Sequence, residues 1–319
     1  MYTRRMAALA LFLAAAQSYA QDYPTRAINI TVPNPPGGMN QIHAQPLSAV
    51  LERLTKQPAP IVNRPGGTAA IGTAYVANQP DGYNILVTTP NLYLVIEKDK
   101  LYGIKSPFSL DQISLLALLS ADPLIMVVHP SMPVKSPKEL AALAKKRPNE
   151  IVFSSSGPYG ITHTPTAMFM HAAGIKMRHL PTTGGGPAII QVLGGHAQVT
   201  GGGPAAVYAH IQSGKLRAIA SWGTKPHPAL PKVPTLQSMG YKGVEAYLWV
   251  GLFTSSGVPE PVQVRMRELI GNAAADPSFK SALEKVKVVP DYRDAPEFRK
   301  FFDEDYKRMA AAIKNIGKL

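Results

Sequence analysis

Short apolar runs alternate along this chain with stretches of helical periodicity. Apolar runs bounded by Pro and Gly predict buried strands, and apolar residues three or four positions apart predict amphipathic helices. Strands are predicted at residues 28–32, 61–62, 83–88, 124–128, 151–153, 218–221 and 247–254. Helices are predicted where Ile42, Leu47, Val50, Leu51 and Leu54 recur, at 69–77, 136–146 and 188–193, and after residue 294.

Two of these helices begin with a capping signal, at residues 136–139 and 294–297. In such a box the first side chain accepts from the backbone N–H of the fourth residue. Pro137 stands at the first helical position, where its missing N–H costs nothing. The second box opens a helix with an apolar stripe that we expect to pack in the core, at Phe298, Phe302, Tyr306, Met309 and Ile313. Asp303 and Asp305 are expected on its solvated face.

Alternating strands and helices indicate an α/β fold with a mostly parallel sheet. A length of 319 residues favours two domains. The apolar strands near 124–129 and 247–254 are candidates for segments that cross between two lobes. A chain that leaves one lobe and returns gives lobe 1 at residues 21–124 and 248–319 and lobe 2 at 125–247, with two strand crossovers at the hinge.

The first twenty residues have the pattern of a signal peptide. Arg4 and Arg5 precede an apolar stretch at 6–16 that is too short to span a bilayer. Ser18 and Ala20 place small residues where a signal peptidase needs them. We therefore expect cleavage after Ala20 and export to the bacterial periplasm; the alternative is a membrane anchor or a buried helix.

Composition excludes several functions. The chain has no cysteine, so disulfides, thiolate metal sites and cysteine nucleophiles are absent. The net charge of +13 comes without long Lys/Arg runs, which argues against nucleic acid as a partner. No nucleophile elbow, phosphate-binding loop, dinucleotide fingerprint or zinc motif occurs, and the eight His are scattered. We expect no enzyme activity, no metal and no cofactor.

Four loops rich in Gly, Ser and Thr stand at the ends of predicted strands instead, at residues 37–41, 154–163, 182–187 and 201–204. Such loops expose backbone N–H groups at helix N-termini, where aligned peptide dipoles favour an anion. Each loop taken alone can be a simple turn. Four of them in an exported two-lobed chain indicate a cleft that binds an anion at the carboxyl ends of strands.

Several motifs in these segments resemble one known family. The motifs are Tyr23-Pro24-Thr25-Arg26, Pro35-Pro36-Gly37-Gly38, Asn63-Arg64-Pro65-Gly66-Gly67, Pro80-Asp81-Gly82-Tyr83 and Gly214-Lys215-Leu216-Arg217-Ala218. In order and spacing they are similar to the Bug family, the periplasmic substrate-binding receptors of tripartite tricarboxylate transporters. The resemblance implies a two-lobed type II periplasmic-binding-protein fold, a Venus flytrap. It also implies a small organic carboxylate as ligand, membrane permease subunits as partners, and a chain we expect to be monomeric.

The resemblance and the loops together give a set of ligand-binding residues. Backbone N–H groups of 37–40 and hydroxyls and amides of 155–161 are expected to converge on the carboxylate from opposite lobes. The full set is Asn34, Gly37, Gly38, Met39, Asn40, Thr88, Thr89, Ser155, Ser156, Tyr159, Gly160, Ile161, His163, Thr183, Gly202 and Gly203.

Departures from the family pattern bear on the ligand. The family's Gly-Thr-Asp is Met39-Asn40-Gln41 here, its Tyr-Lys is Thr182-Thr183, and a bulky segment is replaced by residues 201–203, all glycine. A lost carboxylate and three lost side chains favour a larger anion. We expect an aromatic mono- or dicarboxylate such as terephthalate, with Tyr159 offering a ring face. The alternative is a backbone that moves inward and keeps the pocket small, for a small aliphatic dicarboxylate.

Two other classes of function stay open. A periplasmic enzyme needs a proton-transfer group in the cleft, for which His163 is the best candidate, although hydrogen bonding that orders its loop explains this residue as well. A co-receptor that presents its ligand to a signalling sensor is compatible with the same fold.

Overall fold

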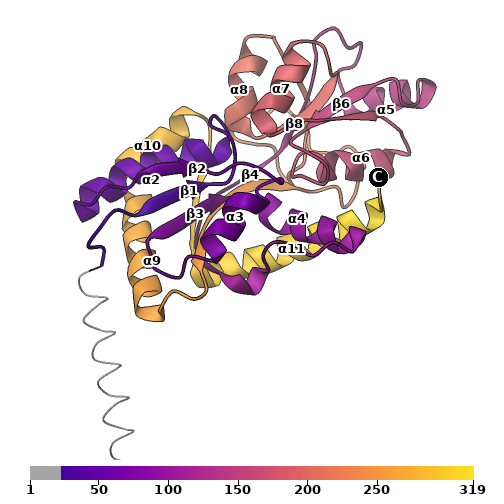
Figure 1. Cartoon of the computed structure of the whole chain (residues 1–319). Helices are drawn as coiled ribbons and strands as arrows, with labels where there is room; N and C mark the ends of the chain where they lie inside the picture. Colours follow the sequence, from indigo (N-terminus) through magenta and orange to yellow (C-terminus); the bar gives the residue numbers. More distant parts are fainter. Residues whose placement is uncertain (1–22) are drawn as a thin grey trace, which may run out of the picture.

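The computed structural model describes residues 23–319 (Figure 1). The predicted signal peptide therefore lies outside the described residues. Two separate β-sheets organise the chain, one with six strands and one with five.

The six-stranded sheet has the order β11-β4-β10-β3-β1-β2. Strand β3 holds the apolar run Ile85-Leu86-Val87 and is buried along its whole length, as expected of a strand that is covered on both faces. The bounds are β1 (Asn29–Val32), β2 (Ile61–Asn63), β3 (Asn84–Thr88), β4 (Ile113–Pro123), β10 (Tyr247–Ser255) and β11 (Pro290–Asp294).

The five-stranded sheet has the order β7-β6-β8-β5-β9. It is formed by the central third of the chain. The bounds are β5 (Ile125–Val128), β6 (Val152–Ser155), β7 (Arg178–Pro181), β8 (Val199–Gly202) and β9 (Arg217–Ser221).

The expectation of a mostly parallel sheet is wrong, because both sheets are mixed. Strand β1 is parallel to β2 and β3, and β6 is parallel to β7 and β8. Strand β10 is antiparallel to β3 and β4, β11 to β4, and β5 to β8 and β9. The antiparallel pairs involve β4, β5 and β10, the strands that carry the chain between the sheets, and their direction is set by that crossing.

Helices cover the sheets, and both predicted caps form. Ser136 accepts from the N–H of Glu139 at the start of α5, and Asp294 accepts from the N–H of Glu297 at the start of α11. The helix bounds are α2 (Met39–Thr55), α3 (Ala70–Ala77), α4 (Asn91–Tyr102), η1 (Leu110–Gln112), α5 (Pro137–Lys146), α6 (Thr164–Ala173), α7 (Gly185–Leu193), α8 (Pro204–Gln212), α9 (Glu260–Ala275), α10 (Pro277–Lys285) and α11 (Ala295–Ile316).

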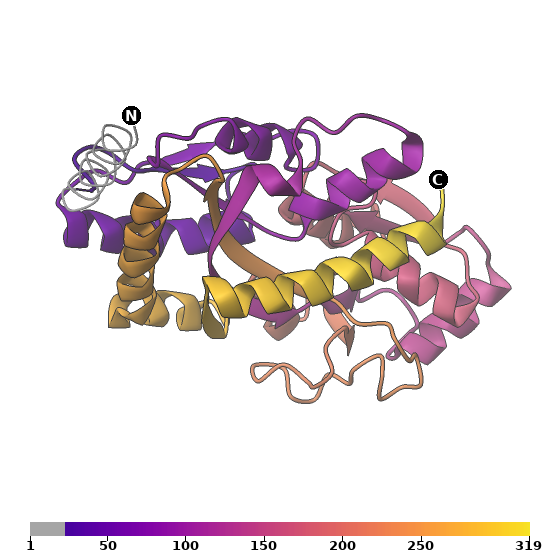
Figure 2. The same cartoon turned by 90° about the horizontal axis from the view of Figure 1, so that it is seen from below.

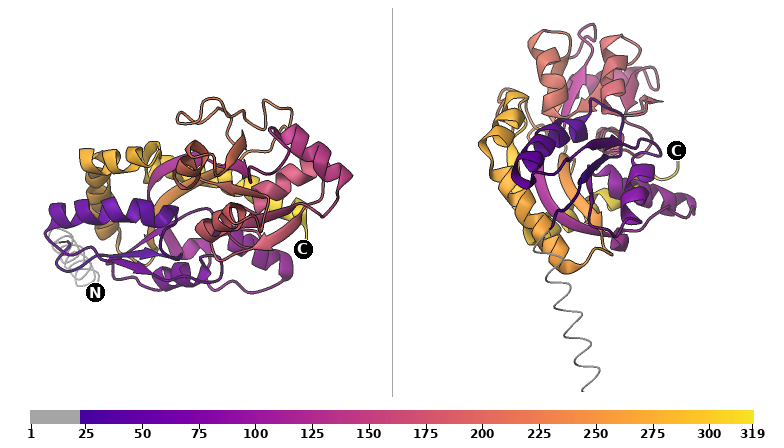
Figure 3. Two further views of the ribbon diagram at one scale, coloured as in Figure 1. Left: turned by 90° about the horizontal axis from the view of Figure 1, so that it is seen from above. Right: turned by 60° about the vertical axis from the view of Figure 1, so that its left-hand side comes forward.

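Three segments connect the two sheets. Strand β4 continues into β5 with only Leu124 between them, and residues 222–246 lead back from β9 to β10. Helix α11 is the third, running beneath the six-stranded sheet towards the helices of the other (Figures 2 and 3). We propose lobe 1 as residues 21–124 and 248–319 and lobe 2 as 125–247, with the hinge at the two strand crossings.

The stripe of α11 packs in the core as predicted. Against the buried Trp249 of β10, the ring of Phe298 packs edge-on and the ring of Phe302 packs at a tilt. Asp305 of the same helix is also buried, so its expected place on a solvated face is wrong. Its carboxylate accepts from the hydroxyl of Tyr93 (2.5 Å) and from Nε1 of Trp249 (2.7 Å), which satisfies a polar group inside the core.

Candidate functional site

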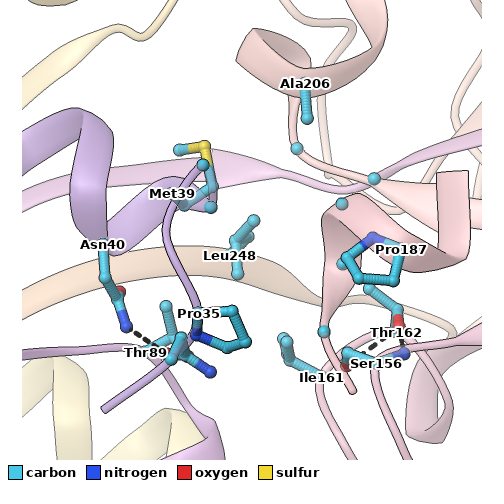
Figure 4. Close-up of a pocket in the computed structure, with 18 of the residues that line it drawn as sticks. Pro35, Met39, Asn40, Thr89, Ser156, Ile161, Thr162, Pro187, Ala206 and Leu248 are labelled. Carbon is cyan, nitrogen blue, oxygen red and sulfur yellow. Dashed lines mark hydrogen bonds between the residues drawn. The ribbon is translucent and has the colours of Figure 1, made fainter. Parts of the chain in front are cut away.

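A pocket lies between the two sheets, at the carboxyl ends of their strands. Its walls come from the loops that follow β1, β3, β6, β7 and β8, with Leu248 of β10 between them (Figure 4). The space free of protein atoms is about 740 Å³, open solvent included. This is the position in which open α/β sheets bind ligands.

The β1–α2 loop presents the N-terminus of a long helix to the pocket. Gly37 has a φ of +90°, which a glycine adopts without strain, and Gly38 is the N-cap with no side-chain cap. Among the described residues, the N–H groups of Met39, Asn40 and Gln41 have no hydrogen-bond acceptor. The dipole of this helix of 17 residues adds partial positive charge at these donors.

Side-chain amides hold this loop in place. Asn40 donates through Nδ2 to Oδ1 of Asn34 (2.6 Å), and Asn63 donates to the carbonyl of Asn34 (2.9 Å). Asn63 also donates to Oε1 of Gln41 (3.2 Å). The side chain of Gln41 is thus bonded to strand β2 in the position where the family pattern has a carboxylate.

The β6–α6 loop is built differently, because its own atoms accept its N–H groups. The N–H of Ser156 donates to Oγ1 of Thr162 (2.7 Å), and the N–H of Tyr159 donates to Nδ1 of His163 (3.2 Å). Gly160 donates to the carbonyl of Gly157 (3.1 Å). The expectation that amides of 155–161 bind the ligand is therefore corrected, since these amides already have partners.

One of these acceptors belongs to a helix that packs with the six-stranded sheet. The N–H of Ile161 donates to Oδ1 of Asn91 (2.8 Å), the first residue of α4. Asn91 is buried and also lines the pocket. What this loop leaves for a ligand is the hydroxyl of Ser156, which accepts from Thr162 and keeps its own proton to donate (3.1 Å).

Lobe 2 supplies free amides from another place, the N-terminus of α7. Gly184 is its N-cap, without a side-chain cap, and the N–H groups of Gly185 and Gly186 have no acceptor among the described residues. Thr182 holds the turn by donating to the carbonyls of Ser155 and Gly184 (2.8 Å each). Two uncapped helix N-termini, α2 and α7, thus face one pocket from opposite sheets.

Apart from Thr89, the remaining lining side chains are apolar. Within the described part of the chain no charged and no aromatic side chain lines the pocket. The apolar side chains are those of Pro35, Pro36, Met39, Ile161, Pro187, Ile189, Ala206 and Leu248. The pocket therefore combines backbone donors for an anionic group with walls for an apolar body.

The three glycines of residues 201–203 do not open the pocket in the expected way. A Cβ at Gly203 meets Cδ2 of Leu248 at 2.8 Å, and one at Gly202 meets Cγ1 of Val207 at 2.6 Å. Trp222 packs on Gly201. Neighbouring apolar side chains occupy the space beside these glycines, so the three glycines by themselves add no room to the pocket.

Tyr159 does not offer its ring to the pocket. Its ring packs against Tyr102 (centroids 6.0 Å apart) and His163 (5.7 Å), and its hydroxyl donates to the carbonyl of Gly317 (2.9 Å). The expectation of a ring face for an aromatic ligand is corrected, because these contacts hold the ring outside the lining of the pocket.

The histidines near the site are neutral at neutral pH. Burial, reinforced by the neighbouring His179, lowers the pKa of His163 to about 3. Burial also lowers the pKa of His179 to about 4 and that of His43 to about 4. His163 is buried and lies outside the lining, so its role is to order the loop rather than to transfer a proton to a ligand.

The structure places most of the predicted residues at the pocket. Those that line it are Asn34, Gly37, Gly38, Met39, Asn40, Thr89, Ser156, Ile161, Gly202 and Gly203. Those that do not are Thr88, Ser155, Tyr159, Gly160, His163 and Thr183. Ser155 is buried with its hydroxyl 2.7 Å from Nε2 of His179, and Thr183 is exposed.

Sequence reasoning missed other lining residues: Pro35, Pro36, Asn91, Thr162, Gly184, Gly185, Gly186, Pro187, Ile189, Ala206 and Leu248. The signal for α7 was present, because residues 182–187 form one of the four glycine-rich loops. For Asn91 and Leu248 no local signal exists, since only the tertiary fold brings them to the pocket.

Known families and proteins include clear matches to this chain. The family model described as "Tripartite tricarboxylate transporter family receptor" matches residues 44–318. The chain is 28% identical to protein BugT of Bordetella pertussis over 99% of this chain and 98% of that protein.

Solved structures share the fold. The periplasmic binding protein BugD has a TM-score of 0.82 and 26% identity, covering 92% of this chain and 99% of its own. A protein of R. palustris solved with adipate has a TM-score of 0.83 and 22% identity, covering 92% of this chain and 98% of its own.

No group of three or more His, Asp or Glu side chains suitable for a metal ion occurs in residues 23–319. None of the helices in that range has the length and apolar content needed to cross a membrane.

Proposed function

This chain belongs to the tripartite tricarboxylate transporter receptor family, a family of substrate-binding receptors rather than enzymes, and from that premise we propose that it captures an aromatic carboxylate in the periplasm for the permease of such a transporter. The supporting observation is the pocket itself. Uncapped N-termini of α2 and α7 face it from opposite lobes, and the described residues that form its walls are largely apolar and carry no charge.

The anionic head of the ligand accepts from backbone amides. The N–H groups of Met39 and Asn40 come from one lobe, and those of Gly185 and Gly186 come from the other, with the hydroxyl of Ser156 beside them. A hydrogen bond to a charged group contributes about 1.5–3 kcal/mol net, so a few of them reach the roughly −8 kcal/mol of a micromolar complex. Because both lobes donate, the ligand binds the closed form more tightly than the open form and so favours closure.

The body of the ligand lies against apolar walls. Pro35, Pro36 and Pro187 provide rigid apolar faces that suit a planar ring, and Leu248 and Met39 complete the surface. Burial of apolar area adds about 25 cal/mol per Å². An aromatic acid such as terephthalate places its carboxylates at the donors and its ring against the apolar walls, whereas citrate carries three carboxylates and a hydroxyl without a comparable apolar body.

An aliphatic dicarboxylate with a long apolar chain is the second candidate. The observation in its favour is the adipate-bound relative of the same fold. Adipate shares with terephthalate an apolar body between two carboxylates, and the two differ in rigidity and in planarity.

Calorimetry on the purified protein, after native mass spectrometry for a retained acid, tests the proposal. Terephthalate, benzoate, adipate, succinate and citrate are titrated separately. We expect terephthalate to bind at micromolar concentration, at least tenfold more tightly than succinate. Tight binding of succinate or citrate with no binding of aromatic acids would overturn the proposal, and a preference for adipate would select the second candidate.

We also propose that the chain acts as a monomer in the periplasm after removal of residues 1–20, and that it hands its ligand to permease subunits. A pull-down with permease and with sensor fragments separates transport from signalling. Retention on the permease alone, only when terephthalate is added, is the expected result.

A further inference from the structure

Tyr159 points away from the pocket and meets groups from two other segments. Its hydroxyl lies 3.0 Å from the hydroxyl of Tyr102 and donates to the carbonyl of Gly317 (2.9 Å). The N–H of Leu319 donates to the hydroxyls of Tyr159 (3.0 Å) and Tyr102 (3.1 Å). These four groups form one connected hydrogen-bond network.

The network joins the two lobes. Tyr102 is the last residue of α4, on the lobe of the six-stranded sheet, and Tyr159 lies in the β6–α6 loop of the other lobe. Gly317 and Leu319 follow α11, which crosses from the first lobe to the second and ends beside this loop (Figure 2). Separation of the lobes must break the contacts that Tyr159 makes with Tyr102.

The loop that carries Tyr159 is also a wall of the pocket. Ser156 and Ile161, on either side of Tyr159, line the cavity, and Ile161 bonds across to Asn91. Tyr159 has a φ of +56°, a left-handed conformation that a tyrosine keeps only when its surroundings hold it. His163 holds it by accepting the N–H of Tyr159. One rigid loop thus faces the pocket on its inner side and the network on its outer side.

We propose that Tyr102, Tyr159 and residues 317–319 form a latch that holds the two lobes together from outside the pocket. The latch acts without the ligand, so it goes beyond the proposed function and does not depend on which acid binds. A consequence is that displacing residues 317–319 from Tyr159 favours the open form. A partner protein that binds these residues would therefore promote release of the ligand.

The population of the open form tests the latch. The chain has no cysteine, so Asn272→Cys on α9 and Lys146→Cys on α5 create two unique spin-labelling sites on exposed positions, one per lobe. Double electron–electron resonance without added ligand then measures the distances between the lobes. The variants are Tyr159→Phe and Tyr102→Phe, which remove a hydroxyl and keep the ring. Tyr292→Phe on β11 is the control, because the hydroxyl of Tyr292 has no hydrogen-bond partner among the described residues and takes no part in the network.

We expect Tyr159→Phe to raise the ratio of open to closed form roughly 2- to 13-fold, the factor that one neutral hydrogen bond supplies. Tyr102→Phe should give a change of the same sign, and Tyr292→Phe should give none. The proposal is overturned if Tyr159→Phe matches Tyr292→Phe, or if the unsubstituted chain is entirely open. If circular dichroism shows that Tyr159→Phe does not fold, Tyr102→Phe at a half-exposed ring decides the question. Because no ligand is added, failure of the calorimetric test leaves this result unaffected.

Discussion

The β1–α2 loop and the β6–α6 loop have similar compositions and opposite uses of their backbone. Both are rich in small residues, both follow a strand, and both line the same pocket. The amides of Met39, Asn40 and Gln41 in the first have no acceptor among the described residues, whereas those of Ser156, Tyr159 and Ile161 in the second donate within the protein.

The difference shows that glycine and serine content alone does not make a binding loop. The first loop is a donor surface because it ends in an uncapped helix, where donors are left over by geometry. The second loop is a rigid wall because His163, Thr162 and Asn91 accept its amides. The donors of lobe 2 come instead from α7, whose first amides are free for the same reason as those of α2.

Acidification should destabilise the protein through its buried histidines, His163 of the second loop and His43 of the helix that follows the first, and this is the largest effect we expect. Burial lowers the pKa of His163 to about 3, below its ordinary value of 6.5, so the unfolded chain binds this proton more readily than the folded chain. The stabilisation is therefore fully present above pH 6.5 and is lost as the pH falls from 6.5 towards 3. Each such histidine lowers the free energy of unfolding by about 1.4 kcal/mol per pH unit in that window.

Urea unfolding between pH 4.5 and 7.5 measures this slope. His163→Asn keeps an acceptor for the N–H of Tyr159 and removes the titrating ring. The free energy of unfolding of this variant should therefore fall less steeply as the pH is lowered, by about 1.4 kcal/mol per pH unit, the contribution of one proton. His43 lies in α2, the helix that follows the β1–α2 loop, and burial lowers its pKa to about 4. His43→Asn therefore serves as the matched variant for the first loop. Equal slopes for the unsubstituted chain and His163→Asn would contradict this explanation.

Removing a single free amide should weaken binding without unfolding the protein. Proline is accepted at the first position of a helix after an extended residue, and both Gly184 and Gly38 are extended there. Gly185→Pro and Met39→Pro should each raise the Kd for terephthalate about 10- to 150-fold, the loss of one charge-assisted hydrogen bond.

Matched controls keep the amide. Gly185→Ala adds a Cβ that meets no atom within 4 Å, and Met39→Leu keeps an apolar side chain of similar size. Calorimetry should show near-normal affinity for both. If the alanine and proline variants at position 185 bind equally, the amide of this residue is not a ligand donor.

A methyl group at position 203 should have the smallest effect. The new Cβ of Gly203→Ala meets Cδ2 of Leu248 at 2.8 Å, and the flexible end of a leucine can move a few tenths of an ångström. We expect a two- to tenfold loss of affinity, about 0.4–1.4 kcal/mol. Leu248→Ala removes part of the apolar wall as well as the clash, so the double variant is compared with Leu248→Ala alone, and the two should bind equally; Gly186→Ala, whose Cβ meets nothing within 4 Å, is the control. If Gly203→Ala costs as much affinity in the Leu248→Ala chain as in the unsubstituted chain, the clash is not the cause.

Much of the architecture could be predicted because its signals are local. The caps at Ser136 and Asp294 form within four residues, so their side chains and backbone donors stand next to each other in the sequence. The direction of the strands could not be predicted in this way. Whether β10 runs parallel or antiparallel to β3 depends on the path that the residues between them take through the second lobe. Hydrophobic periodicity carries no information about that path.

The sequence by itself determined the capped starts of α5 and α11, the glycine-rich turns beside the pocket, the apolar stripe of α11 and the motifs of the receptor family. Only the tertiary structure decided which backbone amides remain free. The N–H of Ile161 is taken by Asn91, 70 positions away, and the buried Asp305 is satisfied by Tyr93, 212 positions away. The physical reason is that a donor's availability depends on what packs beside it, and packing brings together residues that the sequence keeps apart.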